Sequence, residues 1–277
     1  MGRLRGYLAM VGVLVAWGSS YSLTKLALNY MSPFVLAMFR FLLGGFVLAV
    51  VGGGVVFSRK SFINALLNSA LFVAFLNLAV EYSVNPALAS VLIYTQPLFV
   101  VLLALLFYRE RLTVFQMIGV VVAFVGLLLT VGITGFDLGD VLSIVGGFVW
   151  ALGTHYYRRN LANEDLIRLN AALGLYSAII DSPLLALNPG IDLTFNAFLW
   201  GVVTALVAQV MGFILWFLAV KDLGPVTASS VSILVPVSAF VFAYLLLDRV
   251  PTVMEAVGSA VTLIGVMLTQ LRRNPQT

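Results

Sequence analysis

The sequence predicts an all-α integral membrane protein whose ten transmembrane helices form a 5+5 inverted-topology repeat. Three observations carry this prediction. The chain is 62% hydrophobic and only 9% charged, with a mean hydropathy of +1.09; it divides into apolar stretches of spanning length; and its two halves resemble each other. A soluble domain carries roughly 25% charged residues, so a surface this poor in charge must face lipid.

Composition also excludes several classes of function. A membrane-crossing helix takes about 20 residues, so a chain of 277 residues filled with such helices has no room for a soluble catalytic or nucleic-acid-binding domain. The net charge of +4 therefore reflects membrane topology, and we expect no nucleic-acid partner. The chain contains no cysteine, which excludes disulfides, thiol chemistry and cysteine-ligated metals.

Charged and turn residues divide the chain into ten apolar segments. Long apolar runs without strict alternation indicate helices and not a barrel. The first run is too long for the apolar region of a signal peptide and has no small-residue cleavage site after it, so we interpret it as a retained helix. The expected spans are 7–28, 34–56, 62–81, 87–108, 113–132, 140–157, 169–187, 196–219, 226–247 and 252–271.

The distribution of charge predicts the orientation. If the N-terminus is cytoplasmic, the inner segments hold twelve of the 15 basic residues, whereas the outer segments carry mainly aspartates. Loops rich in arginine and lysine stay in the cytoplasm. We therefore expect both termini to be cytoplasmic and the protein to lie in the cytoplasmic membrane. The twelve are Arg3, Arg5, Arg59, Lys60, Arg109, Arg111, Arg158, Arg159, Arg168, Lys221, Arg272 and Arg273.

An internal repeat relates the two halves of the chain. A shift of 133 residues aligns Trp17 with Trp150 and Lys25 with Arg158, and further along a shift of 139 aligns prolines and glycines at fixed spacing. The predicted repeats are 1–132 and 138–271, followed by a cytoplasmic tail, 272–277. The residues aligned at the shift of 139 are Pro86, Pro97, Gly119 and Gly126 with Pro225, Pro236, Gly258 and Gly265.

Each predicted repeat holds five helices, so the second half enters the membrane from the opposite side. Two similar halves related in this way are typical of secondary transporters, in which they produce outward-open and inward-open states. A duplication kept for packing, or a channel, is the alternative. A channel requires a continuous polar lining or rings of like charge, and the spans have neither.

The segments 85–90, 96–98, 109–113 and 119–126, with Arg40 in the second span, resemble the EamA-type domain of the drug/metabolite transporter (DMT) superfamily. The second half repeats the pattern at 224–229 and 235–237 and departs from it at the acidic turn, 248–251. The resemblance covers nearly the whole chain. It implies a transporter that exports or exchanges small metabolites, commonly amino acids and related compounds.

Two other functions remain open at this stage. A flippase or exporter of lipid-linked or drug-like molecules on the same fold would need a basic headgroup pocket, for which Arg40 and Lys25 are the candidates. A membrane-embedded enzyme would need clustered acids and histidines or a nucleophile with a base. The chain has a single histidine and scattered acids, so we expect that the protein is not an enzyme. We expect no cofactor and no metal; the oligomeric state stays open.

Two prolines at matching positions mark the expected substrate site. Pro97 and Pro236 lie about ten residues into the fourth and ninth spans, which is roughly 15 Å deep at 1.5 Å per residue. A proline there frees a backbone carbonyl, and paired interruptions point to a binding site at the bilayer midplane. The polar and aromatic residues expected to line it are Trp17, Tyr21, Asn77, Ser90, Tyr94, Trp150, Gln209, Ser229 and Ser232, together with the two prolines.

Ionisable residues within spans are costly and are treated as functional candidates. Arg40 is expected either to bind a substrate carboxylate or, as the favoured interpretation, to pair with Glu81. Asp181 is a candidate proton site or a cap of a broken helix. His155 is expected near the inner end of the sixth span, as a gate or interfacial residue, with a proton relay as the alternative.

Small residues recur on one face of the fifth and of the tenth span. Such stripes let helices approach closely. We expect each stripe to pack within its own half, with dimerisation as the alternative. The stripes are Gly119, Ala123 and Gly126, and Gly258, Thr262 and Gly265.

Overall fold

The computed structural model describes residues 2–96, 98–99, 102–103, 106, 113–131, 137–161, 163–223 and 231–270. Over these residues the helical segments compose ten transmembrane helices, five in each half of the chain. Six of the described helices are long and apolar enough to cross a membrane on their own. The expected all-α membrane fold with a 5+5 inverted repeat is confirmed.

The first half runs through five helices. They are α1 (Gly2–Leu28); α2 (Pro33–Gly52); a third helix made of α3 (Arg59–Ala65), the π-helical η1 (Leu66–Ala70) and α4 (Leu71–Tyr82); a fourth that includes α5 (Pro86–Ile93); and α7 (Val114–Val131).

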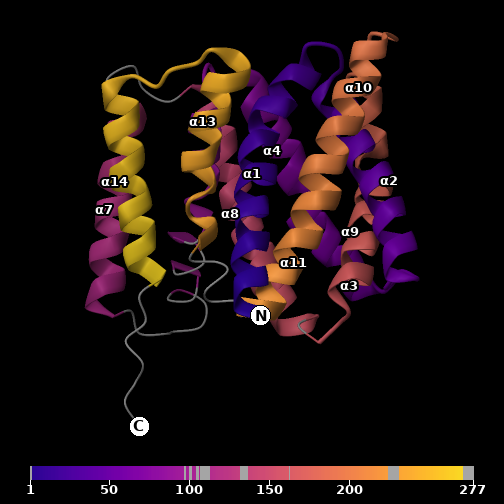
Figure 1. Ribbon diagram of the computed structural model, residues 1–277, viewed down its shortest axis with the longest axis horizontal. Coiled ribbons are helices and arrows are strands. Elements are labelled where there is room, and N and C mark those ends of the chain that lie inside the picture. The colour runs from indigo at the N-terminus through magenta and orange to yellow at the C-terminus, as the bar shows by residue number, and fades with distance from the viewer. Residues whose placement is uncertain are drawn as a thin grey trace.

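The second half follows the same order. It consists of α8 (Leu138–Asn160); α9 (Leu166–Asp181) with the short η3 (Ser182–Ala186); an eighth helix made of α10 (Phe195–Thr204), the π-helical η4 (Ala205–Met211) and α11 (Gly212–Leu223); a ninth that includes α13 (Val235–Leu247); and α14 (Val253–Gln270). α1 begins and α14 ends at the same face of the molecule, which we call the N-terminal face (Figure 1).

Local sequence explains where the helices begin and end. The side chain of Asn85 accepts a hydrogen bond from the Ala87 N–H at 3.1 Å, and Asp137 and Asp140 form a reciprocal capping box at the start of α8. Both arrangements satisfy backbone donors that have no partner within the helix. α2 ends at Gly53, whose φ of 63° is a left-handed conformation that glycine adopts without strain.

The interruptions within the helices repeat from one half to the other. The π-helical segments begin at Leu66 and Ala205, and the turns that break the fourth and ninth helices begin at Tyr94 and Ile233. Both pairs are 139 residues apart, the shift found in the sequence. Since π-helical turns are rare and are frequently found at functional sites, their occurrence at matching positions makes the third helix of each half a candidate site element.

The two halves are interlocked, because the first helix of each packs on the third helix of the other. At Gly6, a Cβ atom would lie 2.7 Å from Leu223 at the end of α11; at Gly139, it would lie 2.7 Å from the backbone nitrogen of Ser83 at the end of α4. Gly6 and Gly139 are 133 residues apart. The same contact thus occurs at the N-terminal face and at the opposite face, as a two-fold axis in the membrane plane requires.

The small-residue stripes pack against each other across the two halves. α7 and α14 lie side by side at one end of the molecule (Figure 1). A Cβ atom at Gly126 would collide with the backbone of Thr262, and one at Gly265 with the backbone of Ala123. The expectation that each stripe packs within its own half is wrong, because the two-fold axis brings the two glycine faces together and each gives the other room for close approach.

The exterior is apolar, as a bilayer requires. Large side chains are exposed along the outward faces of α2, α7 and α14, where they cannot join a protein core. They include Phe46, Val50, Val121, Phe124, Leu128, Val257, Ile264 and Met267.

Candidate functional site

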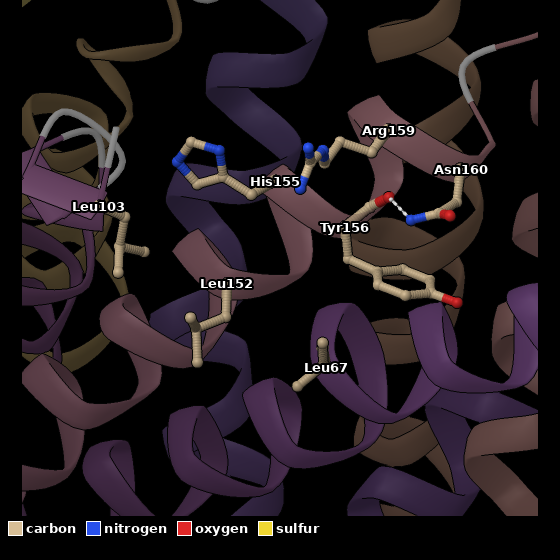
Figure 2. A pocket seen from close by; sticks show the side chains of 7 residues that line it. All are labelled: Leu67, Leu103, Leu152, His155, Tyr156, Arg159 and Asn160. Atoms are coloured by element: carbon tan, nitrogen blue, oxygen red, sulfur yellow. Dashed lines mark hydrogen bonds between the residues drawn. The ribbon is translucent and has the colours of Figure 1, made fainter. Parts of the chain in front are cut away.

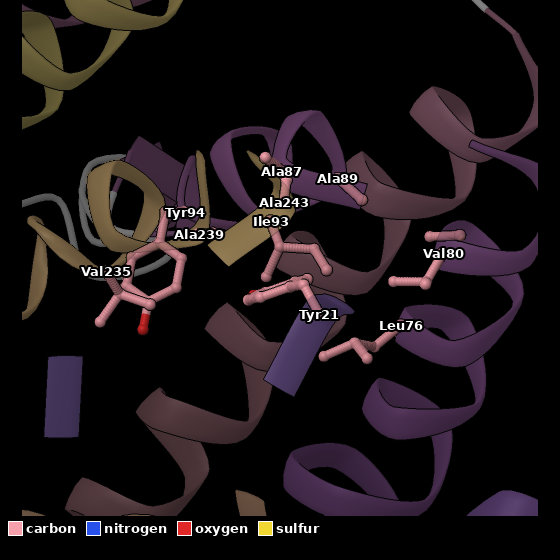
Figure 3. Packing of buried hydrophobic residues seen from close by; sticks show 11 residues of the cluster. Tyr21, Leu76, Val80, Ala87, Ala89, Ile93, Tyr94, Val235, Ala239 and Ala243 are labelled. Carbon is pink, nitrogen blue, oxygen red and sulfur yellow. The ribbon is translucent and has the colours of Figure 1, made fainter. Parts of the chain in front are cut away.

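Aromatic side chains from α1, the fourth helix and α8 meet at the centre of the molecule. Tyr21 and Tyr94 are 4% and 5% exposed and belong to one buried cluster with Val235 and Ala239 of α13 (Figure 3). Trp150 of α8 packs on this cluster and meets the ring of Tyr94 edge-on, with ring centroids 5.9 Å apart. Four helices thus contribute to this region, and the repeat relates them as two pairs: α1 with α8, and the fourth helix with the ninth. We call it the aromatic region.

Phe72 of α4 extends this aromatic region. Its ring stacks on Trp150 with centroids 5.0 Å apart. The sequence analysis did not single out Phe72, although Phe72, Leu76 and Val80 recur every fourth residue on one helix face, and this spacing marks a shared packing surface.

Trp17 is the repeat equivalent of Trp150 and packs against the same buried cluster. Its indole N–H donates to the carbonyl oxygen of Ala208 at 3.1 Å, and its ring packs against Phe213 and Trp216. Ala208 lies in the π-helical η4, and bulges of this kind disturb the regular pairing of backbone carbonyls. The expected site residue Gln209 is the next residue in η4; it is 3% exposed and packs against Gly44 of α2.

Arg40 lies next to the aromatic region and pairs with an amide. It is 5% exposed, and its Nη1 donates to Oδ1 of Asn77 at 3.2 Å, while Nδ2 of Asn77 donates to the carbonyl oxygen of Pro33 at 2.9 Å. The favoured sequence interpretation, a pair with Glu81, is wrong for the described residues. Arg40 is seven residues into α2 and meets the third helix one turn deeper than Glu81.

Glu81 lies at the face opposite the N-terminus, where its backbone carbonyl accepts a hydrogen bond from Lys25. The amine of Lys25 donates to the carbonyl oxygens of Val80, Glu81 and Ser83 at 2.9, 2.7 and 3.2 Å. These carbonyls lie at or just beyond the C-terminal end of α4, where a helix has no backbone donors left and a cation is favoured. Lys25 therefore ties the end of α1 to the end of the third helix.

Asp181, the last residue of α9, is 1% exposed. Its side chain makes no capping hydrogen bond at the start of η3, so the proposed role as a cap is wrong. Its Oδ2 is buried without a hydrogen-bond partner within the described residues. A buried acid in this condition is costly, and its role as a proton site stays a prediction.

A pocket of about 520 Å³ opens between the third, fourth and sixth helices (Figure 2). Leu67, Leu103 and Leu152 form its apolar part, and His155 and Arg159 lie toward the end of α8 at the N-terminal face. His155 is thus placed in an open pocket near the expected inner end of its helix. The remaining lining residues are Tyr156 and Asn160.

The other expected site residues differ in their surroundings. The Ser90 hydroxyl donates to the Ala87 carbonyl of its own helix at 2.6 Å and is fully buried, so it has no spare donor for a ligand. Pro236 lies in the first turn of α13, directly after the break in the ninth helix, and Ser232 lies just before that break. Pro97 and Ser229 lie outside the described residues.

A model of the EamA-like transporter family matches residues 4–132 and again residues 137–271. The chain belongs to this family. One match falls in each half of the chain, and a membrane transporter is established as the broad function.

Several similar proteins align with the chain over nearly its full length. An uncharacterized transporter of Archaeoglobus fulgidus is 28% identical, with 97% of this chain and 98% of that protein covered. A probable amino-acid metabolite efflux pump of Escherichia coli is 26% identical, with 97% and 95% covered, and so is the protein of the same name in Salmonella typhimurium. A solved crystal structure has a TM-score of 0.68 at 19% identity, with 96% of both chains covered, and this likeness shows the fold alone.

Proposed function

We propose that this EamA-like protein exports or exchanges amino acids, or similar amphipathic metabolites, across the cytoplasmic membrane by alternating access. The observation that carries this proposal is the aromatic region formed by Tyr21, Tyr94, Phe72 and Trp150 at the junction of the two halves. Aromatic walls with a few fixed polar groups suit a solute that has an apolar side chain and a polar end. The names of the Escherichia coli and Salmonella typhimurium relatives support the same class of substrate.

Alternating access is supported by an asymmetry between repeat-equivalent positions. His155 lines the pocket at the N-terminal face, whereas Ser22, the residue 133 positions earlier, is fully buried in α1 with its hydroxyl unpartnered within the described residues. Equivalent positions in the two halves therefore differ, because His155 lines an open pocket and Ser22 is closed off from solvent. We infer that the second state opens Ser22 and closes His155.

The contacts of Lys25 hold the face opposite the N-terminus closed in this state. Their rupture accompanies the change of state, in which helices of one half rock against those of the other, with the interrupted fourth and ninth helices as flexible points. Pro97→Ala and Pro236→Ala are expected to change the exchange rate more than the affinity, and unchanged kinetics in both variants would contradict this assignment. With the termini in the cytoplasm, the pocket of Figure 2 is the cytoplasmic entrance.

Counterflow in proteoliposomes tests the proposed function. Vesicles are loaded with unlabelled amino acids and given labelled phenylalanine, leucine or threonine outside, with Trp150→Ala as the pocket variant and Phe124→Ala, on the lipid-facing side of α7, as the matched control. Accumulation of the aromatic or branched label that is lost only in Trp150→Ala supports the proposal.

Three outcomes contradict it. Accumulation of no amino acid, together with exchange of a lipid-linked sugar or a cationic drug, would favour a flippase or drug exporter on this fold. Equal loss in both variants would remove the aromatic site. Hydrolysis or group transfer by the purified protein would favour a membrane-embedded enzyme.

A further inference from the structure

Arg40 is a buried cation that is only partly satisfied by the protein. A guanidinium carries five N–H donors and stays charged inside a protein. Of these donors, Nη1 bonds to Asn77, and Nε is buried without a partner within the described residues. The side chain is 5% exposed, so bulk water does not complete its hydrogen bonding in this state.

No carboxylate of the described residues neutralises this charge. An ion pair would place an acidic oxygen within 4.0 Å, and among the described residues the pair that meets this distance is Arg5 with Asp222, at the N-terminal face. Neither Asp181 nor Glu81, the two acids that the sequence analysis singled out, makes such a contact with it. A lone charge in a membrane protein is expensive and marks a ligand or ion pathway.

The partner that Arg40 does have is neutral and held in place. The amide of Asn77 is oriented by its second hydrogen bond, to the carbonyl oxygen of Pro33. Asn77 can therefore orient the guanidinium but cannot cancel its charge. On the side of α1, the phenol of Tyr21 lies within electrostatic reach of Arg40, and Tyr21 belongs to the central aromatic cluster.

Packing of the repeat does not require an arginine here. The residue 133 positions later is Leu173, which is buried in an apolar cluster with Leu161 and Leu169. Contacts between α2 and α9 confirm that a shift of 133 applies to this helix pair. Phe41 packs with Ala178, and the residues equivalent to these two under that shift, Gly174 and Gly45, also contact each other, as two-fold symmetry requires. The same helix position thus packs well with a hydrocarbon side chain.

We propose that Arg40 binds the carboxylate of the transported solute, whose apolar part lies against Tyr21 and the aromatic region. This inference rests on the proposed function and narrows its substrate class to amphipathic carboxylates. A carboxylate accepts two parallel N–H bonds from a guanidinium, which supplies both the missing charge and an acceptor for Nε. The solute reaches Arg40 when the face opposite the N-terminus opens.

Competition counterflow separates this role from a structural one. Proteoliposomes accumulate labelled phenylalanine, and unlabelled phenylalanine or phenylalaninamide competes; the amide keeps the ring and the amine but lacks the carboxylate. Wild-type protein should prefer the acid at least tenfold. In Arg40→Gln, the apparent affinity for phenylalanine should fall about tenfold to a hundredfold, as loss of a charge-assisted hydrogen bond predicts, and the acid and the amide should compete equally.

Asn77→Asp provides a second variant that keeps the arginine. It places a carboxylate beside Nη1, so Arg40 is neutralised internally and the preference for the acid should fall by the same mechanism. Arg59→Gln, at the exposed start of α3, is the matched control and should behave as wild type. Monodispersity in size-exclusion chromatography verifies that each variant is folded, and if Arg40→Gln fails this check, Asn77→Asp decides.

The outcomes distinguish this inference from the proposed function. Equal competition by acid and amide in wild-type protein, or an unchanged preference for the acid in a folded Arg40→Gln or Asn77→Asp variant, overturns the role of Arg40 and leaves amino-acid transport intact. Failure of wild-type protein to exchange any amino acid or amide, with exchange of another solute class, overturns both.

Discussion

Removing the Lys25 amine should open the face opposite the N-terminus. In Lys25→Met, the apolar stem is kept and the three hydrogen bonds to the end of the third helix, of 2.7 to 3.2 Å, are lost. A hydrogen bond from a charged donor contributes about 1.5–3 kcal/mol, and partial exposure of Lys25 reduces this. We take the whole contact as about 2 kcal/mol, which is roughly a thirtyfold change in the ratio of closed to open protein.

Single-cysteine labelling measures that ratio. The chain contains no cysteine, so Ser22→Cys introduces a unique thiol at a position that is fully buried when this face is closed. A membrane-impermeant thiol reagent added from that face should label Ser22→Cys slowly, and up to about thirtyfold faster when Lys25→Met is added. In the Lys25 wild-type background, His155→Cys should label readily from the N-terminal face, because it lines the open pocket.

Arg249→Met is the matched control for this experiment. Arg249 follows α13 in an exposed turn and contributes a repulsive charge near Lys25, but it donates to none of the three carbonyls. Labelling of Ser22→Cys that is unchanged by Lys25→Met would refute the reasoning. So would an equal increase in Arg249→Met, because the effect would then follow local charge and not the lost hydrogen bonds.

Three further predictions concern the centre and the helix contacts. Trp17→Phe keeps an aromatic ring but loses the hydrogen bond to Ala208, so the affinity for aromatic solutes should fall about threefold to tenfold in a fluorescence titration. Trp17→Leu, the control, removes the ring as well and should lower this affinity further. Trp150→Ala removes two aromatic contacts of about 0.5–1.5 kcal/mol each and should lower the apparent affinity for phenylalanine by tenfold or more in counterflow; an effect on threonine of the same size would contradict an aromatic site. Gly126→Val forces apart the backbones of α7 and α14 and should cost at least about 1–3 kcal/mol, seen as a lower thermal midpoint in detergent, and an unchanged midpoint would refute the close contact with Thr262.

Much of the architecture could be predicted because hydropathy and helix-ending residues act locally. The expected spans resume at 87 and at 140, and the segments just before them contain a side-chain cap, Asn85, and the first residue of a capping box, Asp137. The faces of the aromatic residues were also accessible, since residues three or four apart on a helix point the same way. Tyr94 and Trp150 were therefore recognisable as inward-facing before their contact was known.

The partners of the polar side chains could not be predicted in the same way. Arg40 meets Asn77 and not Glu81 because the depth at which two helices cross depends on their tilt and on the bulge η1, neither of which hydropathy encodes. Ser90 shares a helix face with Tyr94, yet its hydroxyl turns back to its own helix. A hydroxyl can bond to a carbonyl of the preceding turn without reference to any other helix.

The sequence by itself determined the number of spans, because the transfer of successive residues into lipid is additive along the chain. It also determined the ends of the spans and the repeat, because prolines, glycines and capping residues act locally and can be recognised at fixed spacing. Only the tertiary structure decided that the glycine stripes of α7 and α14 face each other, that Lys25 bonds to the end of the third helix and that a pocket opens at the N-terminal face. Helices that are equally apolar have no hydrophobic preference for one neighbour over another inside a bilayer. Their partners are selected by shape and by a few polar contacts, and these exist only once the helices are assembled.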